Sequence, residues 1–264
     1  MTDILLTALD TDGVLRLTMN TPAKRNALSE DMLVALSTAL GKASNDPATR
    51  VIVLAAHGPA FCAGHDLKEL TAARTAPDRG REVFARIMTL CSTVMQQIVN
   101  CPKPVIAEVG GIATAAGCQL VASCDLAVAS HTATFSTPGV HIGLFCSTPM
   151  VALSRNLSNK HAMEMLLTGD MVPAARAAEI GLVNHTVPAD TLTDNTLGLA
   201  RKIASKSSMT LATGKKAFYA QRDMPLADAY AHAAQVMVEN MLARDAEEGI
   251  QAFIEKRAPH WQDK

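Results

Sequence analysis

Residues 4–20 show an alternation of hydrophobic and polar positions that is typical of β-strands. The segments "ILLTALD" and "VLRLTMN" lie on either side of "DG" at 12–13, and Asp-Gly favours the tight turn between antiparallel strands. A helix is predicted to follow "TPAKRNALS", with Ser29 and Asp31 at its N-terminus. Its apolar positions recur at helical spacing, at Met32, Leu33, Leu36 and Leu40. The chain therefore begins with a predicted hairpin and a predicted amphipathic helix.

Continuous apolar runs further along the chain predict strands that are buried on both faces. "VIVLAA" (51–56) and "KPVIAEV" (103–109) are of this kind, and a helix is predicted between them over 81–99. Two shorter strands are expected in "DLAVAS" and "ATFSTPG". Because strands, glycine-containing loops and helices follow one another repeatedly, we expect an α/β core of stacked ββα units.

Helices dominate the pattern from Pro149 onward. "GLVNHTVP" is the only later segment that favours a strand, and residues 190–258 are predicted to form three helices. We therefore divide the chain into a core over residues 1–195 and a helical C-terminal region over residues 196–264.

Composition and charge restrict the classes of function. The chain has 264 residues, of which 48% are hydrophobic and 19% charged, with a net charge of −1 and only 3% aromatic residues. These values fit a soluble globular protein, and the lack of a basic segment argues against nucleic acid as a partner. No apolar run is long enough to span a membrane, and the N-terminus has no basic leader. We therefore expect a cytoplasmic protein with no membrane partner.

Cysteines and histidines are arranged without the spacing of a metal site. The six cysteines include no CxxC pair and the eight histidines no HExxH, so we expect free, mostly buried thiols and no bound metal. The sequence also lacks GxGxxG, GxSxG and a complete phosphate-binding loop.

Two loops of small residues are the best candidates for chemistry. "FCAGHD" (61–66) and "GGIATAAGCQ" (110–119) each follow a predicted strand and lead into a predicted helix or helical turn. Small residues allow the backbone to approach a ligand closely, and a helix N-terminus leaves N–H donors unpaired. Two interpretations follow. The loops aim two N–H groups at one carbonyl oxygen, or they are tight connections whose glycines serve geometry alone.

Four segments of the chain resemble the enoyl-CoA hydratase/isomerase, or crotonase, superfamily. They are "NTPAKRNALS", "FCAGHDLKEL", "KPVIAEVGGIATAAGCQLVASCDLAVAS" and "GLVNHTVP". Within it, "GHDLKEL", "AAGCQLVASCD" and "GLFCSTP" resemble the subgroup of enoyl-CoA hydratase domain-containing protein 3. The resemblance implies a crotonase-like spiral of repeated ββα units with a helical C-terminal region, and trimers or dimers of trimers formed through residues 196–264. It also implies acyl-CoA thioesters as substrates, as in fatty acid metabolism.

The resemblance also implies where an acyl-CoA would bind. The backbone N–H groups of His65 and Ala116 would form an oxyanion hole for the thioester oxygen. Coenzyme A enters as part of the substrate, so no separate cofactor is expected. Lys24 and Lys68 either contact phosphate groups or are simply solvated. The remaining substrate contacts would be Arg25, Ala27, Ala63, Asp66, Leu67, Ile112, Pro138 and Leu144.

The sequence departs from the family pattern at both acid/base positions. Hydratases of this family carry a glutamate where this chain has Gln119, and a second one where "STPGVHIG" has Gly139. An amide side chain donates and accepts hydrogen bonds but does not transfer a proton at neutral pH. A positioned acid or base contributes roughly 10²–10⁴-fold to a rate. We therefore expect ordinary hydration to be weak.

Other side chains are candidates to replace the missing acid or base. His141 is either a base or a structural hydrogen-bonding residue, and Cys146 either faces the pocket or is a small buried apolar residue. Glu108 is expected to form a structural pair, and Asp66 and Glu69 to cap or solvate the short helix after the first loop.

Three functions remain open from the sequence. The first is an acyl-CoA enzyme of the hydratase/isomerase group with weak or altered chemistry. The second is a non-catalytic acyl-CoA binding or regulatory protein. The third is a decarboxylase of malonyl-type acyl-CoA, which needs an oxyanion hole but no strong base; the "GHD" at His65 resembles such enzymes. Because Tyr219 and Tyr230 lie far along the C-terminal region, a tyrosine in the pocket is not expected.

Overall fold

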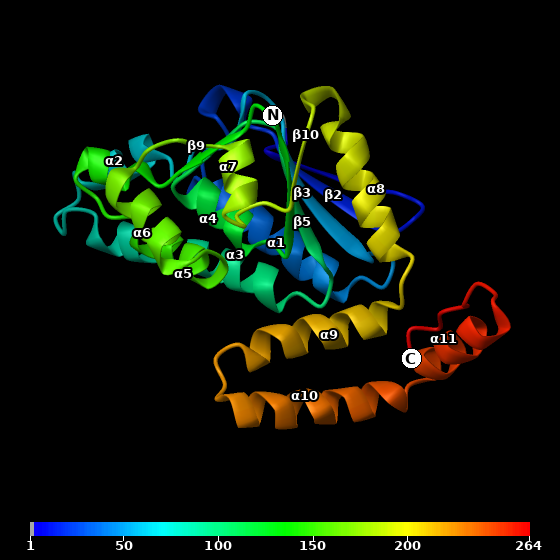
Figure 1. Cartoon of the computed structure of the whole chain (residues 1–264). Coiled ribbons are helices and arrows are strands. Elements are labelled where there is room, and N and C mark those ends of the chain that lie inside the picture. Colours follow the sequence, from blue (N-terminus) through cyan, green and yellow to red (C-terminus); the bar gives the residue numbers. More distant parts are fainter. Residues whose placement is uncertain (1–2) are drawn as a thin grey trace.

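A six-stranded sheet forms the main layer of the computed structural model, which describes residues 3–264 (Figure 1). Its strand order is β1-β2-β3-β5-β7-β10. β1 and β2 pair antiparallel, which confirms the predicted hairpin, and all other neighbours in this sheet pair parallel. The strands are β1 (Leu5–Leu9), β2 (Val14–Met19), β3 (Val51–Ala56), β5 (Val105–Val109), β7 (Leu126–Ser130) and β10 (His185–Val187).

Four shorter strands form a second sheet in the order β4-β6-β8-β9. β4 follows β3 directly, β6 follows β5 and β8 follows β7, so each repeat adds one strand to each sheet. The predicted ββα repetition is thereby confirmed. β9 was missed, because a two-residue strand that ends in a proline carries no alternating pattern. These strands are β4 (Ala60–Cys62), β6 (Ile112–Thr114), β8 (Thr134–Ser136) and β9 (Val172–Pro173).

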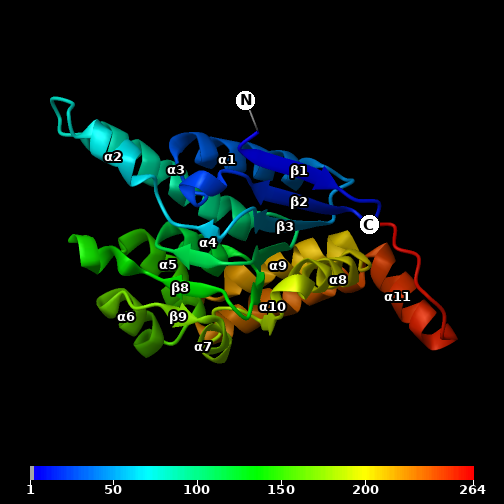
Figure 2. The same cartoon turned by 90° about the horizontal axis from the view of Figure 1, so that it is seen from above.

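Strand β3 is buried on both faces, as its continuous apolar run predicts. Ile52 and Leu54 join the core cluster formed with α1 (Glu30–Asn45) and α3 (Arg81–Asn100). Val51 and Val53 point the other way and pack with α8 (Leu192–Ala204). Figure 2 shows α1 and α8 on opposite sides of this strand. The sheet is therefore the middle of three layers.

Helix α1 begins where the sequence predicts. The Ser29 hydroxyl accepts a hydrogen bond from the Met32 N–H at 3.3 Å, and this satisfies one of the free donors of the first turn. The shorter α2 (Leu67–Ala73) is capped by the Asp66 carboxylate, which accepts from the Lys68 and Glu69 N–H groups. The predicted capping role of Asp66 is thus confirmed.

Helix α4 (Ala116–Ser123) lies at the centre of the molecule, with all eight residues buried. It packs against α5 (Ser147–Asn156), and the Asn156 amide donates to the Ala122 carbonyl at 2.7 Å. α6 (Asn159–Thr168) packs against α5, and α7 (Ala174–Glu179) lies beside β8, β9 and β10. Short 3-10 helices cover Pro22–Lys24, Pro138–Ile142 and Ala189–Thr191.

The C-terminal region contains four helices within residues 190–258, not the three that were predicted. They are α8, α9 (Ser208–Gln221), α10 (Leu226–Met241) and α11 (Arg244–Glu255). α10 and α11 are separated by Leu242 and Ala243 alone, without the glycine or proline that marks a break in a sequence. α8 crosses the predicted boundary at 195/196, and its packing on the sheet extends the core to about the end of this helix.

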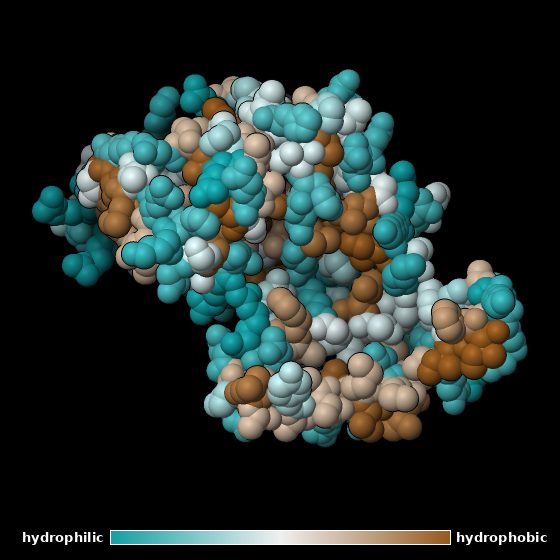
Figure 3. Space-filling view, viewed as in Figure 1, coloured by the Kyte–Doolittle hydropathy of each residue, from teal (hydrophilic) through white to brown (hydrophobic). Residues whose placement is uncertain are grey.

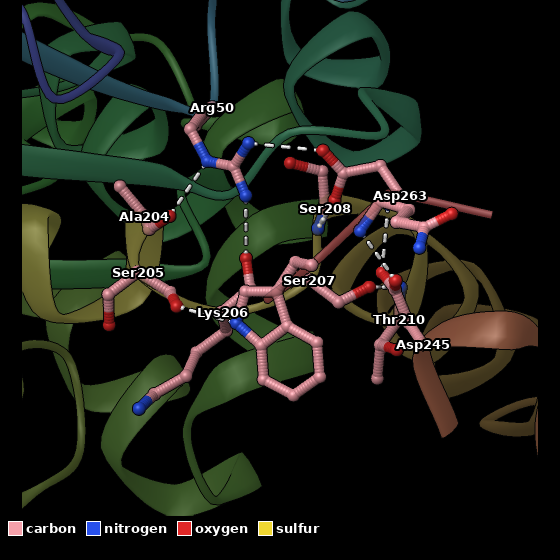
Figure 4. A network of polar contacts seen from close by, with 11 residues as sticks. Arg50, Ala204, Ser205, Lys206, Ser207, Ser208, Thr210, Asp245 and Asp263 are labelled. Atoms are coloured by element: carbon pink, nitrogen blue, oxygen red, sulfur yellow. Dashed lines mark hydrogen bonds and ion pairs between the residues drawn. The ribbon is translucent and has the colours of Figure 1, made fainter. Parts of the chain in front are cut away.

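The C-terminal tail is fastened to the junction between α8 and α9 (Figure 4). The Arg50 guanidinium donates to the carbonyls of Ala204 and Lys206 at 2.7 and 2.8 Å and pairs with Asp263 at 3.1 Å. Asp263 accepts from the Ser208 N–H at 2.6 Å, at the start of α9. One arginine therefore holds both the start of the helical hairpin and the end of the chain.

A second carboxylate, which is buried, completes this junction. Asp245, in the first turn of α11, accepts from the N–H groups of Gln262 and Asp263 at 2.7 and 3.0 Å. The Trp261 indole donates to the Ser205 carbonyl at 2.9 Å. The tail thus ties α11 to the core across α8.

Apolar side chains remain exposed on the last two helices (Figure 3). In the view of Figure 3 they gather along α10 and over α11. No helix in the described range 3–264 has the length and apolar character that crossing a membrane requires. The exposed residues include Leu226, Tyr230, Met237, Val238, Met241, Leu242, Ile250, Phe253 and Ile254.

Candidate active site

The two small-residue loops meet after the ends of β4 and β6. Gly64 has φ +90°, and a Cβ placed on it would lie 2.9 Å from the Ala115 Cβ. A Cβ on Gly117 would lie 2.1 Å from the Cys62 carbonyl oxygen. Any side chain at these two positions would push the loops apart. The glycines therefore allow a backbone contact that no other residue permits.

Two backbone N–H groups are available at this contact. Ala115, with φ 50° and ψ −120°, turns the chain so that α4 begins at Ala116. On the other loop, the Gly64 carbonyl accepts from the Leu28 N–H at 2.8 Å. Within residues 3–264, neither the His65 nor the Ala116 backbone N–H donates a hydrogen bond to another protein group. Both predicted donors are thus brought to adjacent loops with their hydrogens unused.

The His65 ring is held in a largely apolar place. Its Nδ1 lies 3.3 Å from the Leu28 carbonyl oxygen, while its buried Nε2 has no partner among the described residues. Burial lowers the pKa of His65, and the Leu28 carbonyl opposes this shift only in part. The imidazole is therefore neutral near pH 7, with its Nδ1 proton directed at Leu28.

Gln119 lies one turn into α4 and lines a cavity of about 1000 Å³. The residue is only 4% exposed, and its Oε1 has no hydrogen-bond partner in the described structure. A buried amide oxygen without a partner is costly, so it indicates a group that a ligand would satisfy. α3, α4, α5 and α9 contribute the other walls of the cavity.

Gly139 is buried in the 3-10 helix Pro138–Ile142. A Cβ at this position would lie 2.8 Å from the Leu144 carbonyl oxygen and 2.9 Å from the Cys146 sulfur. The loop has therefore closed on the space that a side chain would need. Cys146 is buried here, as expected for a small apolar residue, and burial raises its thiol pKa.

His141 bonds away from the cavity of Gln119. Its Nε2 lies 2.8 Å from the Thr168 carbonyl oxygen, at the end of α6. Neither His141 nor Gly139 is among the residues that line the cavity in the described structure. This contact gives His141 a structural hydrogen bond that joins the loop to α6.

The predicted coenzyme A contacts fall on neighbouring loops. The Lys24 ammonium pairs with Asp66 at 3.3 Å, and the Arg25 carbonyl accepts from the Ala63 N–H at 3.0 Å. Ala27 and Leu67 border this pair of segments, with Lys68 in the first turn of α2. The other predicted contacts lie on β6 and around the Gly139 turn, namely Ile112, Pro138 and Leu144.

Asn26 holds this arrangement together, although the sequence did not single it out. Its side chain is fully buried and donates to the carbonyls of His57 and Ala60 at 2.9 and 2.8 Å, while accepting from the Thr21 N–H. Its φ of 51° is a conformation that asparagine tolerates better than most residues. An asparagine in the predicted loop "KRNALS" was therefore the sequence feature that could have indicated this role.

A tyrosine does line the cavity, and the sequence-based expectation was wrong on this point. α9 folds back so that Tyr219 faces the same space as Gln119. Its hydroxyl donates to Asp125 at 2.9 Å, and Lys215 pairs with the same carboxylate at 2.7 Å. Burial and the adjacent Asp125 raise the pKa of Tyr219. Tyr219 therefore stays protonated.

Glu108 and Glu69 have structural roles. Glu108 forms an ion pair with Arg16 and accepts from the Thr193 hydroxyl at 3.0 Å, so the predicted structural pair is confirmed. Glu69 accepts from the Glu30 N–H at 3.1 Å. Across residues 3–264, no group of three or more His, Cys, Asp or Glu side chains is placed to hold a metal ion.

Comparison with known proteins places the chain in a family. The family model described as enoyl-CoA hydratase/isomerase matches residues 10–264. The chain belongs to the enoyl-CoA hydratase/isomerase family. Mitochondrial enoyl-CoA hydratase domain-containing protein 3 of Rattus norvegicus is 47% identical to it over 250 residues, which cover 95% of this chain and 82% of the relative.

Solved structures of the family superpose over nearly the whole chain. An enoyl-CoA hydratase of Mycobacterium smegmatis has a TM-score of 0.93 and 49% identity, with 98% of this chain and 99% of that chain covered. Human enoyl coenzyme A hydratase domain-containing protein 3 has a TM-score of 0.92 and 45% identity, with 98% and 100% covered. The predicted resemblance to this subgroup and the crotonase fold are thereby confirmed.

The expected cytoplasmic location is contradicted by these relatives. The rat, mouse and human proteins, at 47–48% identity, all carry "mitochondrial" in their names. Targeting peptides are cleaved off and are not part of the folded domain. The composition and hydrophobic pattern of the domain therefore do not determine the cellular compartment.

Proposed function

We propose that this family member binds an acyl-CoA thioester whose carbonyl oxygen accepts hydrogen bonds from the His65 and Ala116 backbone N–H groups. The observation that carries the proposal is the contact of the two loops, which Gly64 and Gly117 make possible, together with two N–H groups that donate to no acceptor among residues 3–264. Such preorganised donors stabilise the charge that develops on a thioester oxygen. Coenzyme A enters as part of the substrate, and the proposed site requires no separate cofactor.

The chemistry at this site is altered from ordinary hydration. Hydration of an enoyl-CoA needs a base to activate water and an acid to protonate the α-carbon. Gln119 supplies neither, and the space beside Gly139 is filled by Leu144 and Cys146. The enzyme therefore retains binding and oxyanion stabilisation, while its hydration of crotonyl-CoA is slower by several powers of ten than positioned acids and bases allow.

The proposal is tested with a pair of ligands that differ only at the carbonyl. Butyryl-CoA carries the thioester oxygen, while S-butyl-CoA has a CH₂ group in its place. Calorimetry should show that butyryl-CoA binds about tenfold more tightly, as expected for the loss of two hydrogen bonds to one oxygen. Equal affinities would show that the two N–H groups do not hold the thioester.

Decarboxylation of a malonyl-type acyl-CoA is a second candidate, favoured by the neutral Gln119, which lies one turn along α4 from Ala116 and its free N–H group. The bond between the carboxylate carbon and the α-carbon breaks, and CO₂ leaves. The electron pair passes to the thioester enolate, whose oxygen the two N–H groups stabilise, and water returns a proton to the α-carbon. Release of CO₂ from malonyl-CoA by the purified protein tests this candidate. Saturable binding without any turnover would instead identify a non-catalytic binding protein.

Self-association through the C-terminal helices is part of the proposal. α10 and α11 expose Met237, Val238, Met241, Phe253 and Ile254, and exposed apolar patches mark interaction surfaces. We propose that these helices pack in a trimer or a dimer of trimers. Sedimentation velocity at micromolar concentration distinguishes these states, and a monomer would contradict the proposal.

A further inference from the structure

The cavity beside Gln119 carries cations that no carboxylate neutralises. Arg155, Lys216 and Arg222 line it, and none of the three forms a salt bridge within residues 3–264. Lys215, which also lines it, is different because Asp125 pairs with it at 2.7 Å. Among the described residues of the lining, Asp223 is the one carboxylate. Three uncompensated cations against a single carboxylate give the cavity a positive potential.

Two of these cations are fixed at the junction of α5 and α9. The Arg222 guanidinium, just after α9, donates to the Arg155 carbonyl at the end of α5, and it lies 5.8 Å from the Phe218 ring centre. The Arg155 guanidinium donates to the Val151 carbonyl at 3.3 Å. A guanidinium has five N–H donors, and these bonds use few of them. Both side chains therefore keep free N–H donors that can form a bidentate pair with a carboxylate.

A continuous path joins these cations to Gln119. Ala122 lies on the same helix as Gln119, and its carbonyl accepts from Asn156, the neighbour of Arg155, at 2.7 Å. The walls between are largely apolar, with Met95, Val99, Ala152 and Ala212. Such a wall fits a short methylene chain. Lys24 and Lys68 do not contribute to this lining, so the cations here are separate from those expected near the coenzyme A phosphates.

We infer that the acyl group accepted by this site ends in a second carboxylate, as in the mono-CoA thioester of a short dicarboxylic acid. The methylene chain passes Gln119 along the apolar wall, and the distal carboxylate binds Arg155 and Arg222. This inference rests on the proposed function, because it places the thioester at His65 and Ala116.

The test compares ligands that differ only at the far end of the acyl chain. Binding constants are measured by calorimetry for free CoA, butyryl-CoA, succinyl-CoA, glutaryl-CoA and adipyl-CoA. The carboxylated thioesters should bind at least about tenfold more tightly than butyryl-CoA, with the best chain length set by the distance to the arginines. Equal affinity for butyryl-CoA and all three carboxylated ligands would overturn the inference. The proposed function would still stand if butyryl-CoA bound more tightly than S-butyl-CoA.

Three arginine variants locate the effect. Arg222→Gln and Arg155→Gln should each remove most of the preference for the carboxylated ligands and leave butyryl-CoA binding unchanged. Arg176→Gln, on the surface of α7 and paired with Glu179, is the matched control and should change nothing. Arg155→Gln keeps the inference testable if Arg222→Gln unfolds the α5–α9 junction, because in the described part of the chain the Arg155 side chain bonds only within its own helix. If the variants weaken free CoA equally, the cations bind phosphate and the inference is wrong.

Discussion

Gly117 and Cys62 touch backbone to backbone, since a Cβ on Gly117 would lie only 2.1 Å from the Cys62 carbonyl oxygen. This contact sets the distance between the loops that carry the His65 and Ala116 N–H groups. Neither the start of α4 nor the end of β4 can move away without separating these donors. The geometry of the proposed site therefore depends on the absence of a side chain at Gly117.

Gly117→Ala should abolish acyl-CoA binding and lower stability, because a methyl group here must displace backbone atoms. Overpacking of this kind costs about 1–3 kcal/mol of unfolding free energy. Gly41→Ala is the control, since a Cβ on Gly41 meets nothing within 4 Å in the middle of α1. That change should stabilise the protein by up to about 1 kcal/mol. Urea unfolding and calorimetry with butyryl-CoA measure both effects, and normal binding by Gly117→Ala would contradict the account of the loops.

Gln119→Glu should raise the rate of crotonyl-CoA hydration by about 10²-fold, because it restores one proton-transferring group at the cavity. Burial would raise the pKa of the new carboxyl and suit it to acid or base work near neutral pH. The measurement is the loss of conjugated thioester absorbance. A wild type as fast as the variant would mean that another residue already supplies the proton.

Gly139→Glu should behave differently from Gln119→Glu. The new side chain meets the Leu144 carbonyl and the Cys146 sulfur, so the loop must open before a second glutamate reaches the substrate. We expect a lower melting temperature and no gain in hydration over Gln119→Glu alone in the double variant. A stable and faster double variant would show that this loop moves freely.

The stability of the folded chain should fall as the pH drops below about 6.5, the ordinary pKa of histidine, through the contribution of His65. Burial lowers the His65 pKa in the folded state, so the unfolded chain binds more protons in this range and gains stability relative to the folded one. Above this range the His65 contribution is constant. Melting temperatures at pH 7.5 and 5.5 measure the effect, and His65→Gln should show a smaller decrease. An identical decrease in both proteins would assign the pH dependence to other groups.

Arg50→Ala should loosen the C-terminal helices, because Arg50 joins the α8–α9 junction to Asp263. Loss of the two bonds to carbonyls should cost about 1–3 kcal/mol of unfolding free energy. Limited proteolysis should then cut preferentially around residues 205–207. Arg176→Ala serves as the control, since Arg176 pairs with Glu179 on the surface of α7. Equal protease sensitivity in the two variants would contradict the role of Arg50.

Much of the fold follows from local sequence pattern. Hydrophobic periodicity and turn residues are signals that act over a few positions. They were sufficient to predict the hairpin at 12–13, the capped helix after Ser29 and the buried strand 51–56. The α10–α11 break and β9 were missed, because Leu242-Ala243 and Val172-Pro173 carry no local signal of their own. The boundary at 195/196 split α8, since a helix that packs on a sheet has the same apolar stripe as one that packs on another helix.

The candidate site was only partly visible in the sequence. The loops with Gly64 and Gly117 stood out because small residues follow strands, but only the structure shows that they touch. Tyr219 was missed because it lies 100 residues beyond Gln119 and reaches the cavity only when α9 folds back. The closed space beside Gly139 was equally hidden, since it depends on where Leu144 and Cys146 come to lie.

A crystal structure of the protein with butyryl-CoA tests the central claim most directly. The account predicts the thioester oxygen about 2.7–3.1 Å from the backbone nitrogens of both His65 and Ala116, with the acyl chain beside Gln119. A thioester oxygen remote from both nitrogens would contradict it.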